Sequence, residues 1–416
     1  MRILHILSQT PDFTGSGKYL QEIIRQSRNS GHANFLLAGV PGGYELPPDL
    51  LEPEHCFLVR FDGADLDFPV AGMSDVMPYP SSVFSCLMPE QVGRYRAIFF
   101  EATRRAVARF APDVLHTNHL WIATAAAREA APGIPLVTTC HGTCLRQHRQ
   151  CSGLSDSLKD SLQAVDWVIA LFPDQKGEIH ELFGIAPDKI DVISGGYDEG
   201  CFHLGEKSLD PQTLQLLYAG KLNATKGVPW LLKSLSRLAD LPFHLHLAGG
   251  GSGPEQQQCL ELAEALGERV TVHGMVSHAA LGELMRQAHI FVLPSFFEGL
   301  PLVLLEAMAC GCRIVTTDLA GARQLFTPLH PTMVRMVELP ALKTIDRPHP
   351  EDWPLLEERL AAALRAGIGE VLAGGQTDQE YVREIASPFT WTKIYARVED
   401  VYRRSLGERG GADCSS

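Results

Sequence analysis

Two glutamates in the second half of the chain have a spacing suited to holding a polyhydroxylated ligand. The segment 295–311 reads SFFEGLPLVLLEAMACG and follows the apolar run HIFVLP. It places Glu298 ahead of a predicted helix over 301–310 and Glu306 about one turn inside that helix. A carboxylate in the apolar run around Glu306 is costly unless it accepts hydrogen bonds, and vicinal hydroxyls would supply two donors at once. The alternative is an amphipathic helix whose glutamates are simply solvated.

The ends of this predicted helix add the chemistry of an anion site. Pro301 suits the first helical turn, where its missing N–H costs nothing, and Gly311 suits a stop just beyond the last turn. Unpaired backbone amides near Leu302 and Val303, helped by the helix dipole, are expected to attract an anion.

Two lysines could straddle a diphosphate. Lys221 and Lys226 stand five residues apart in YAGKLNATKG, after a predicted strand over 214–219. Two cations at the carboxyl end of a strand can neutralise neighbouring phosphates. A solvated turn before a helix is the alternative.

The first half of the chain offers a glycine loop and a histidine. The loop Thr10–Lys18 contains Gly15, Ser16 and Gly17, which let the backbone approach a ligand before a helix predicted over 18–30. It is not a dinucleotide fingerprint, because the third glycine is absent. His141 follows an apolar strand predicted over 135–140, where a ligand cleft is expected, although a lone histidine is more often structural.

Strands and helices alternate along the chain, which predicts parallel pairing in doubly wound sheets. A turn-rich stretch from Gly195 interrupts the alternation, which then restarts. We therefore expect two α/β domains, 1–198 and 199–389, with ligands at the carboxyl ends of the strands and in the cleft between the sheets. The pattern is irregular over 329–354, helices are predicted over 355–372 and 391–406, and the tail 409–416 is expected to fray.

Composition excludes several classes of protein. With 36 Lys plus Arg against 49 Asp plus Glu, the net charge is −13, which disfavours nucleic acid as a partner. No apolar run is long enough to span a membrane, the N-terminus lacks a cleavage site, and the ten cysteines are scattered. We expect a cytoplasmic protein with reduced thiols.

Neither candidate for a metal site has the required context. Asp65 and Asp67 form an Asp-x-Asp triplet in a Pro/Gly-rich loop, and the run from Cys140 to Cys151 lacks paired Cys-x-x-Cys spacing. The sequence therefore predicts no metal and no cofactor.

The segment 295–311 resembles the Glu-x7-Glu motif of the retaining family-four glycosyltransferases, which have the GT-B fold of two Rossmann-like domains facing across a cleft. The resemblance covers most of the chain. It implies an acceptor-binding first domain, a nucleotide-sugar-binding second domain, and a closing helix over about 390–408 that returns to the first domain.

The resemblance also implies roles for individual residues. Glu306 would hold the ribose hydroxyls of the nucleotide, and Glu298 the hydroxyls of the transferred sugar. Lys221, where the family usually has Arg, and Lys226 would neutralise the donor diphosphate. His141 would hold the sugar near the reacting carbon. The expected catalytic residues are His141, Glu298, Lys226 and Lys221. The expected donor-binding residues are Gly15, Gly17, Gly220, Lys221, Lys226, Gly250, Met275, Glu298, Gly299, Leu300, Pro301, Leu302 and Glu306. The expected acceptor-side residues are Ser16, Asn118 and Arg146.

The implied reaction moves a hexosyl unit from a nucleoside-diphosphate sugar to a hydroxyl acceptor with retention at the anomeric carbon. A nucleotide-sugar epimerase or phosphorylase of the same fold, and a non-catalytic sugar-nucleotide-binding subunit, stay open as alternatives. The arginines of the helix predicted over 90–110 form either a solvated basic face or a surface that docks to an anionic membrane at its inner face. The base, the sugar, the acceptor and the oligomeric state are not predicted.

Overall fold

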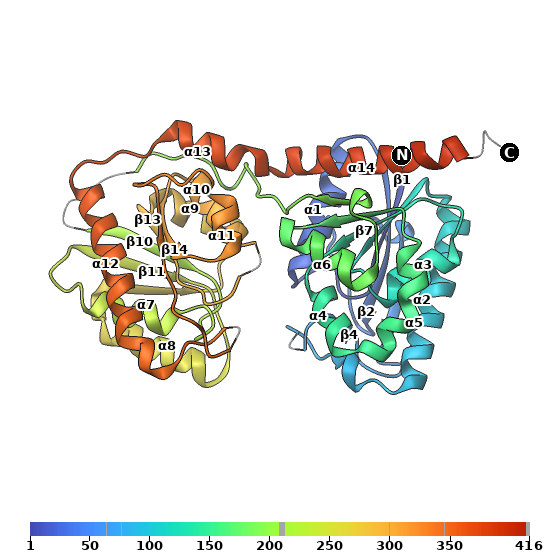
Figure 1. The fold of residues 1–416 in the computed structure, drawn as a ribbon, viewed down its shortest axis with the longest axis horizontal. Helices are drawn as coiled ribbons and strands as arrows, with labels where there is room; N and C mark the ends of the chain where they lie inside the picture. The colour runs from blue at the N-terminus through green and yellow to red at the C-terminus, as the bar shows by residue number, and fades with distance from the viewer. Residues whose placement is uncertain (64, 76, 208–212, 299, 345, 413–416) are drawn as a thin grey trace. The chain divides into compact units, whose positions relative to one another are not determined.

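The structure is a computed structural model of the 416-residue chain that describes residues 1–63, 65–75, 77–207, 213–298, 300–344 and 346–412, with side chains described to 407. The chain divides into two compact units, Met1–Gly195 with Trp391–Ser416, and Gly196–Thr390 (Figure 1). The chain thus passes from the first unit to the second after Gly195, three residues before the expected boundary at 198. Each unit is described by itself below.

The described residues of the first unit form a seven-stranded sheet in which every pair of neighbours is parallel. Its strands are β1 (Arg2–Leu7), β2 (Ala33–Pro41), β3 (Cys56–Phe61), β6 (Val114–Asn118), β7 (Leu136–Cys140), β8 (Trp167–Ala170) and β9 (Ile190–Val192). Their order across the sheet is β3-β2-β1-β6-β7-β8-β9, so successive strands are added on one side of β1 up to β3 and on its other side from β6 onward. A small separate pair, β4 (Ala71–Gly72) and β5 (Ser82–Val83), lies in the connection after β3.

Helices cover both faces of this sheet because its strands are apolar on both sides. On β1, Leu4 and Ile6 belong to the core shared with α2 and α3, whereas Leu7 packs on the other side with Leu20 and Ile24 of α1. The helices of this unit are α1 (Gly15–Asn29), α2 (Pro89–Phe110), α3 (Ile122–Ala130), α4 (Thr143–Gln150), α5 (Ser152–Gln163), α6 (Pro173–Phe183) and α14 (Trp391–Ala412).

The last helix, α14, belongs to the first unit although it lies at the end of the chain. The Tyr402 hydroxyl lies 2.6 Å from Nδ1 of the buried His116 in β6, and Glu399 lies 3.0 Å from His32 Nε2. Arg404 pairs with Asp191 of β9. The helix is described to Ala412, four residues into the stretch expected to fray, and 413–416 lie outside the described residues.

The described residues of the second unit form a six-stranded parallel sheet with the order β12-β11-β10-β13-β14-β15. Its strands are β10 (Leu214–Ala219), β11 (Phe243–Ala248), β12 (Val270–Gly274), β13 (Ile290–Leu293), β14 (Arg313–Thr317) and β15 (Val334–Val337). This is again a doubly wound arrangement, with the reversal between β10 and β13. The two doubly wound parallel-sheet domains predicted from the sequence are therefore confirmed.

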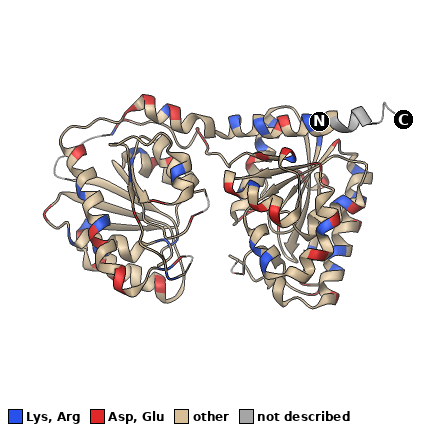
Figure 2. Ribbon diagram, viewed as in Figure 1, with Lys and Arg blue, Asp and Glu red and all other residues tan. Residues whose placement is uncertain are grey.

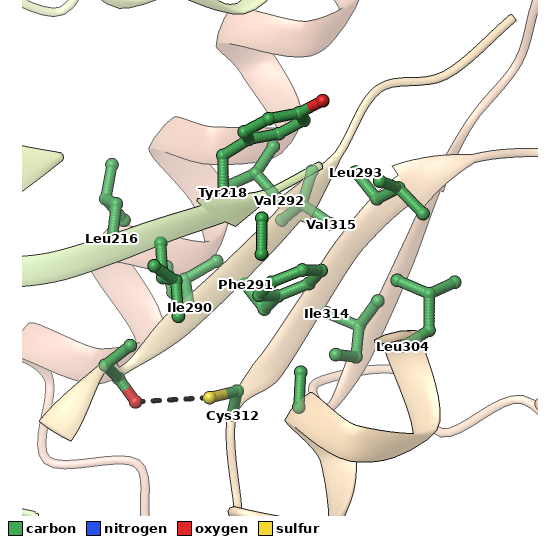
Figure 3. Close-up of a cluster of buried hydrophobic side chains, with 14 of the residues drawn as sticks. Leu216, Tyr218, Ile290, Phe291, Val292, Leu293, Leu304, Cys312, Ile314 and Val315 are labelled. Atoms are coloured by element: carbon green, nitrogen blue, oxygen red, sulfur yellow. Dashed lines mark hydrogen bonds between the residues drawn. The ribbon is translucent and has the colours of Figure 1, made fainter. Parts of the chain in front are cut away.

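The core of the second unit lies on both sides of its two central strands. Leu216 and Tyr218 of β10 belong to the same core as Phe291 of β13 and Ile314 of β14, and Leu304 of α10 lies beside Ile314 (Figure 3). The helices of this unit are α7 (Val228–Ser236), α8 (Gly253–Ala265), α9 (His278–Gln287), α10 (Leu302–Ala309), α11 (Ala320–Leu325), α12 (Trp353–Leu372) and α13 (Gln379–Ala386).

Several elements differ from the sequence-based expectation. The stretch 329–354 is not irregular throughout, because it contains β15. The turn-rich stretch from Gly195, expected to link the two domains, is largely part of the second unit. Phe202 is buried in the core of that unit, and the Tyr197 amide donates to Phe389 O at 2.9 Å, while 208–212 lie outside the described residues. No helix in the described part of the chain combines the length and apolar composition needed to cross a membrane.

Candidate functional site

Three loops of the second unit meet at the carboxyl edge of its sheet. The loop after β10 contacts the loop after β11 through the Leu222 amide, which donates to Gly250 O at 2.8 Å. The loop after β13 joins it through the Phe296 amide, which donates to Thr225 O at 3.0 Å. This edge lies where the sheet order reverses, the position at which open α/β sheets bind ligands.

Lys226 and Glu298, 72 residues apart in sequence, form an ion pair at this edge with Nζ and Oε1 2.7 Å apart. The buried Ser295 hydroxyl donates to the same carboxylate oxygen at 2.7 Å, and the Thr317 hydroxyl fixes Ser295 by donating to its carbonyl at 2.6 Å. Both members of the pair are partly exposed, so each has a charge that water, or a ligand, can reach. The pair places an ammonium and a carboxylate side by side.

Gly227 is what allows the Lys226 loop to approach the Glu298 loop so closely. Its φ is +70°, and a Cβ at this position would lie 1.9 Å from Pro294 O. No other residue fits both that backbone conformation and that gap. Gly227 then begins α7 as its N-cap.

The start of α10 differs from the prediction. Pro301 is the N-cap and not part of the first turn, with φ −80° and ψ 80°, and the helix begins at Leu302. The Leu302 amide donates to Leu300 O at 3.0 Å, so it is not unpaired as expected. This is the hydrogen bond of an inverse γ-turn, a turn that matches the dihedral angles of Pro301. Glu306 lies one turn inside the helix, as predicted, and Gly311 follows its end with φ +77°.

The remaining predicted donor residues are placed by the same loops. Gly220 follows β10 and Gly250 follows β11, and the exposed Met275 side chain lies against Gly250. Lys221 is exposed, and its carbonyl accepts from the Tyr218 hydroxyl at 2.7 Å. Gly299 lies outside the described residues.

In the first unit, the predicted glycine loop is partly helical. Gly15, Ser16 and Gly17 form the first turn of α1 because the Thr14 side chain caps it, accepting from the Gly17 amide at 3.0 Å. A Cβ on Gly17 would lie 2.7 Å from Pro11 C and O, so glycine permits the helix start to pack on the preceding loop. Ser16 is buried there.

His119, which the sequence reasoning missed, is the centre of the hydrogen-bond network at this edge. It follows β6, has φ +73°, and is buried. Its Nε2 lies 3.0 Å from Ser16 Oγ, and its Nδ1 lies 3.7 Å from Cys144 Sγ. The signal in the sequence is a histidine directly after a predicted parallel strand, next to the predicted site residue Asn118.

The structure brings Asn118 and His141, two of the predicted site residues, into contact. Asn118 Oδ1 lies 2.9 Å from His141 Nε2, and the His141 ring packs edge-on against Tyr19. Burial, together with the neighbouring His119 and His116 rings, holds the pKa of His141 well below its ordinary value, so the ring is neutral. The buried Asn118 Nδ2 has no hydrogen-bond partner among the described residues.

Arg146 is placed differently from the other acceptor candidates. It lies on α4, is exposed, and pairs with Asp75. No described contact connects it to Ser16 or Asn118.

The basic residues of α2 are largely engaged by other groups. Arg94 pairs with Asp67 at 2.9 Å, Arg96 with Glu129 at 2.5 Å, and Arg104 with Glu101 at 3.5 Å. Figure 2 shows acidic and basic segments mixed over this unit. The described part of the chain contains no group of three or more His, Cys, Asp or Glu side chains placed to hold a metal ion.

Comparison with known proteins agrees with this architecture. Residues 13–200 match a domain described as Glycosyltransferase Family 4, and residues 213–334 match one described as Glycosyl transferases group 1. The chain is therefore a glycosyltransferase of the GT-B type.

Individual relatives are distant. D-inositol 3-phosphate glycosyltransferase 1 of Catenulispora acidiphila is 28% identical over 347 residues, 72% of this chain and 74% of that one. Glycogen synthase of Mycobacterium tuberculosis is 31% identical over 223 residues. The match covers 53% of that protein, about half of its length, and 50% of this chain.

Solved structures share the fold over nearly the whole chain. Sucrose-phosphate synthase of Thermosynechococcus elongatus has a TM-score of 0.70 at 19% identity, covering 98% of this chain and 100% of that one. HepE of Anabaena, solved in complex with UDP, has a TM-score of 0.66 at 17% identity, covering 97% and 100%.

Proposed function

We propose that this glycosyltransferase transfers a hexosyl unit from a nucleoside-diphosphate sugar to a hydroxyl acceptor, with retention of configuration at the anomeric carbon. The observation that carries the proposal is the Lys226–Glu298 pair at the reversal point of the second sheet. An ammonium there would meet the diphosphate, and a carboxylate would accept hydrogen bonds from sugar hydroxyls. The relatives whose names or complexes include a glycosyl acceptor or UDP support the same chemistry.

In the proposed step, the bond between the anomeric carbon and the diphosphate oxygen breaks while a bond to the acceptor oxygen forms. The acceptor proton passes to the departing phosphate. Lys226, with Lys221 nearby in sequence, would stabilise the negative charge that develops on the diphosphate. Neither glutamate has to act as a nucleophile, and the step requires no metal or cofactor.

Glu298 has a further role in this proposal. In the structure, Lys226 and Ser295 satisfy its carboxylate. On donor binding, sugar hydroxyls would join the Ser295 hydroxyl as its hydrogen-bond donors while Lys226 turns to the phosphates. The ion pair would therefore keep both side chains ordered before the donor arrives.

The direct test is a panel of UDP-, GDP- and ADP-linked hexoses, scored by thermal shift and by hydrolysis, and then with D-inositol 3-phosphate and glucose polymers as acceptors. We expect the nucleotide sugars of one base to raise the melting temperature of the chain, and their hexose to be transferred. NMR should show that the new bond in the product has the same anomeric configuration as the donor. Isomerised donor without transfer would favour an epimerase, and binding without any turnover would favour a non-catalytic subunit.

A further inference from the structure

Three hydrogen bonds fix the backbone of His119. Its amide donates to Thr139 O at 2.9 Å, and its carbonyl accepts from the Trp121 amide at 2.8 Å and the Thr124 hydroxyl at 2.7 Å. These bonds hold a non-glycine residue at φ +73°, a conformation that persists only where the surroundings enforce it. The ring is therefore aimed at Ser16 by the fold.

The sulfur of Cys144 accepts hydrogen bonds. The Leu120 amide donates to it at 3.2 Å, and His119 Nδ1 lies 3.7 Å away. Although burial raises the pKa of the Cys144 thiol, hydrogen bonds with Cys140 and His119 bring that pKa well below its ordinary value. A sulfur that accepts in this way places the neighbouring proton on His119 Nδ1, which leaves Nε2 with a lone pair.

The other contacts of Ser16 agree with this assignment. Gln9 Oε1 accepts from the Met73 amide at 3.3 Å, which orients the amide so that its Nε2 donates to Ser16 Oγ at 2.8 Å. The Ser16 hydrogen then points to His119 Nε2 at 3.0 Å. A third contact, with Thr14 Oγ1 at 3.3 Å, is the longest and the one that an incoming hydroxyl would replace.

We propose that His119 is a positioning residue that holds the Ser16 hydrogen, so that the Ser16 oxygen presents a lone pair to the hydroxyl of the acceptor. This inference rests on the proposed function and names one side chain that the acceptor alcohol would meet. Ser16 orients the acceptor hydroxyl as it binds, and the hydrogen of that hydroxyl turns from Ser16 to the departing phosphate oxygen as the acceptor oxygen attacks. Cys144 keeps His119 in the required tautomer.

The first test needs no substrate. The full chain is labelled with 15N-histidine, and long-range 1H–15N correlations report the tautomer of His119. Its signals are assigned by their loss in His119→Asn, which accepts the left-handed backbone but is too short to reach Ser16. If that variant does not fold, Cys144→Ser, which perturbs the adjacent ring, gives the assignment. We expect hydrogen on Nδ1; hydrogen on Nε2 would overturn the inference.

The second test uses the nucleotide sugar selected by the donor panel, with water as the attacking hydroxyl. Loss of one neutral hydrogen bond should lower kcat of His119→Asn and of Ser16→Ala about five- to tenfold and change the donor KM less than about twofold. Cys144→Ser, whose oxygen can still accept from Nδ1, should retain more activity than Cys144→Ala. Thr143→Val removes the other group near Nδ1, 3.3 Å away, and should change little.

The outcomes separate the two proposals. A wild-type chain that turns over no nucleotide sugar refutes the proposed function, and the acceptor role of Ser16 with it. An active enzyme that shows the Nε2–H tautomer, or the same kcat in His119→Asn as in the wild type, refutes this inference alone.

Discussion

At the scale of single residues, burial decides the charge of the histidines in the first sheet. His5 is completely buried in β1, with Nε2 2.9 Å from Asn34 Oδ1, and burial lowers its pKa to about 4. Because the folded chain keeps this ring neutral, its contribution to stability is complete above the ordinary histidine pKa. This contribution to stability is lost as the pH falls from the ordinary histidine pKa toward the lower pKa that His5 has in the folded chain.

We therefore predict that His5 makes the first unit acid-sensitive. Between pH 7.5 and pH 5, the wild type should lose about 2 kcal/mol more free energy of unfolding than His5→Gln, which cannot take up the proton. Urea denaturation of both proteins at both pH values measures this difference. Equal losses would show that His5 is not the group responsible.

Gly227 gives a second prediction at this scale. Gly227→Ala should destabilise the second unit, since a methyl group would meet Pro294 O, and it should also weaken donor binding by moving Lys226 from Glu298. Gly267→Ala is the matched control, because Gly267 has φ +60° but nothing within 4 Å of its Cβ position. The control should cost only about 1 kcal/mol, the usual penalty of a left-handed residue. Thermal unfolding that ranks the two variants equally would contradict the steric argument.

At the scale of elements, the sequence predicted strands best where an apolar run defines them. The strand over 214–219 was predicted to the residue, because it is a largely buried apolar run bounded by Thr213 and Gly220. The missed elements are short or weakly patterned: β15 has four residues and a half-exposed middle, and α11 has six. Their formation depends on packing against distant parts of the chain, which local pattern does not contain.

The same limit applies to the site. Spacing and residue type singled out Lys226, Glu298 and His141, but not the pairing of the first two, because it joins loops after different strands. His119 was missed because its importance comes from a positive φ and from contacts to residues more than twenty positions away. Nothing in the local sequence announces either property.

The docking of α14 provides a prediction for a whole element. Tyr402→Phe removes a buried hydrogen bond to His116 and should reduce the free energy of unfolding by about 1–3 kcal/mol. Tyr395→Phe, on the same helix, is the control, since the Tyr395 hydroxyl has no hydrogen-bond partner among the described residues. Urea denaturation compares them; a larger loss in Tyr395→Phe would contradict the assigned role of Tyr402.

At the scale of the molecule, the two units divide the chemistry. Unit Gly196–Thr390 contains the predicted donor residues except Gly15 and Gly17, which lie in the other unit together with the His119 network. The net charge of −13 opposes a diphosphate ligand, so its binding depends on local cations.

We predict that a bound nucleotide protects mainly the second unit. Hydrogen exchange with and without UDP, or whichever diphosphate the panel selects, should show slower exchange over 220–227, 249–253 and 300–306. The strands β1 and β6 should exchange at an unchanged rate. Protection confined to the first unit would place the donor elsewhere.

The central claim, that Lys226 at the reversal point of the second sheet binds the donor diphosphate, is tested most directly by titration calorimetry with the selected nucleotide sugar. Lys226→Met should bind at least about tenfold more weakly than the wild type, the loss of one charge-assisted contact. Lys233→Met, which removes an equal charge from the exposed side of α7, should bind as the wild type does. Equal affinity in all three proteins would contradict the account.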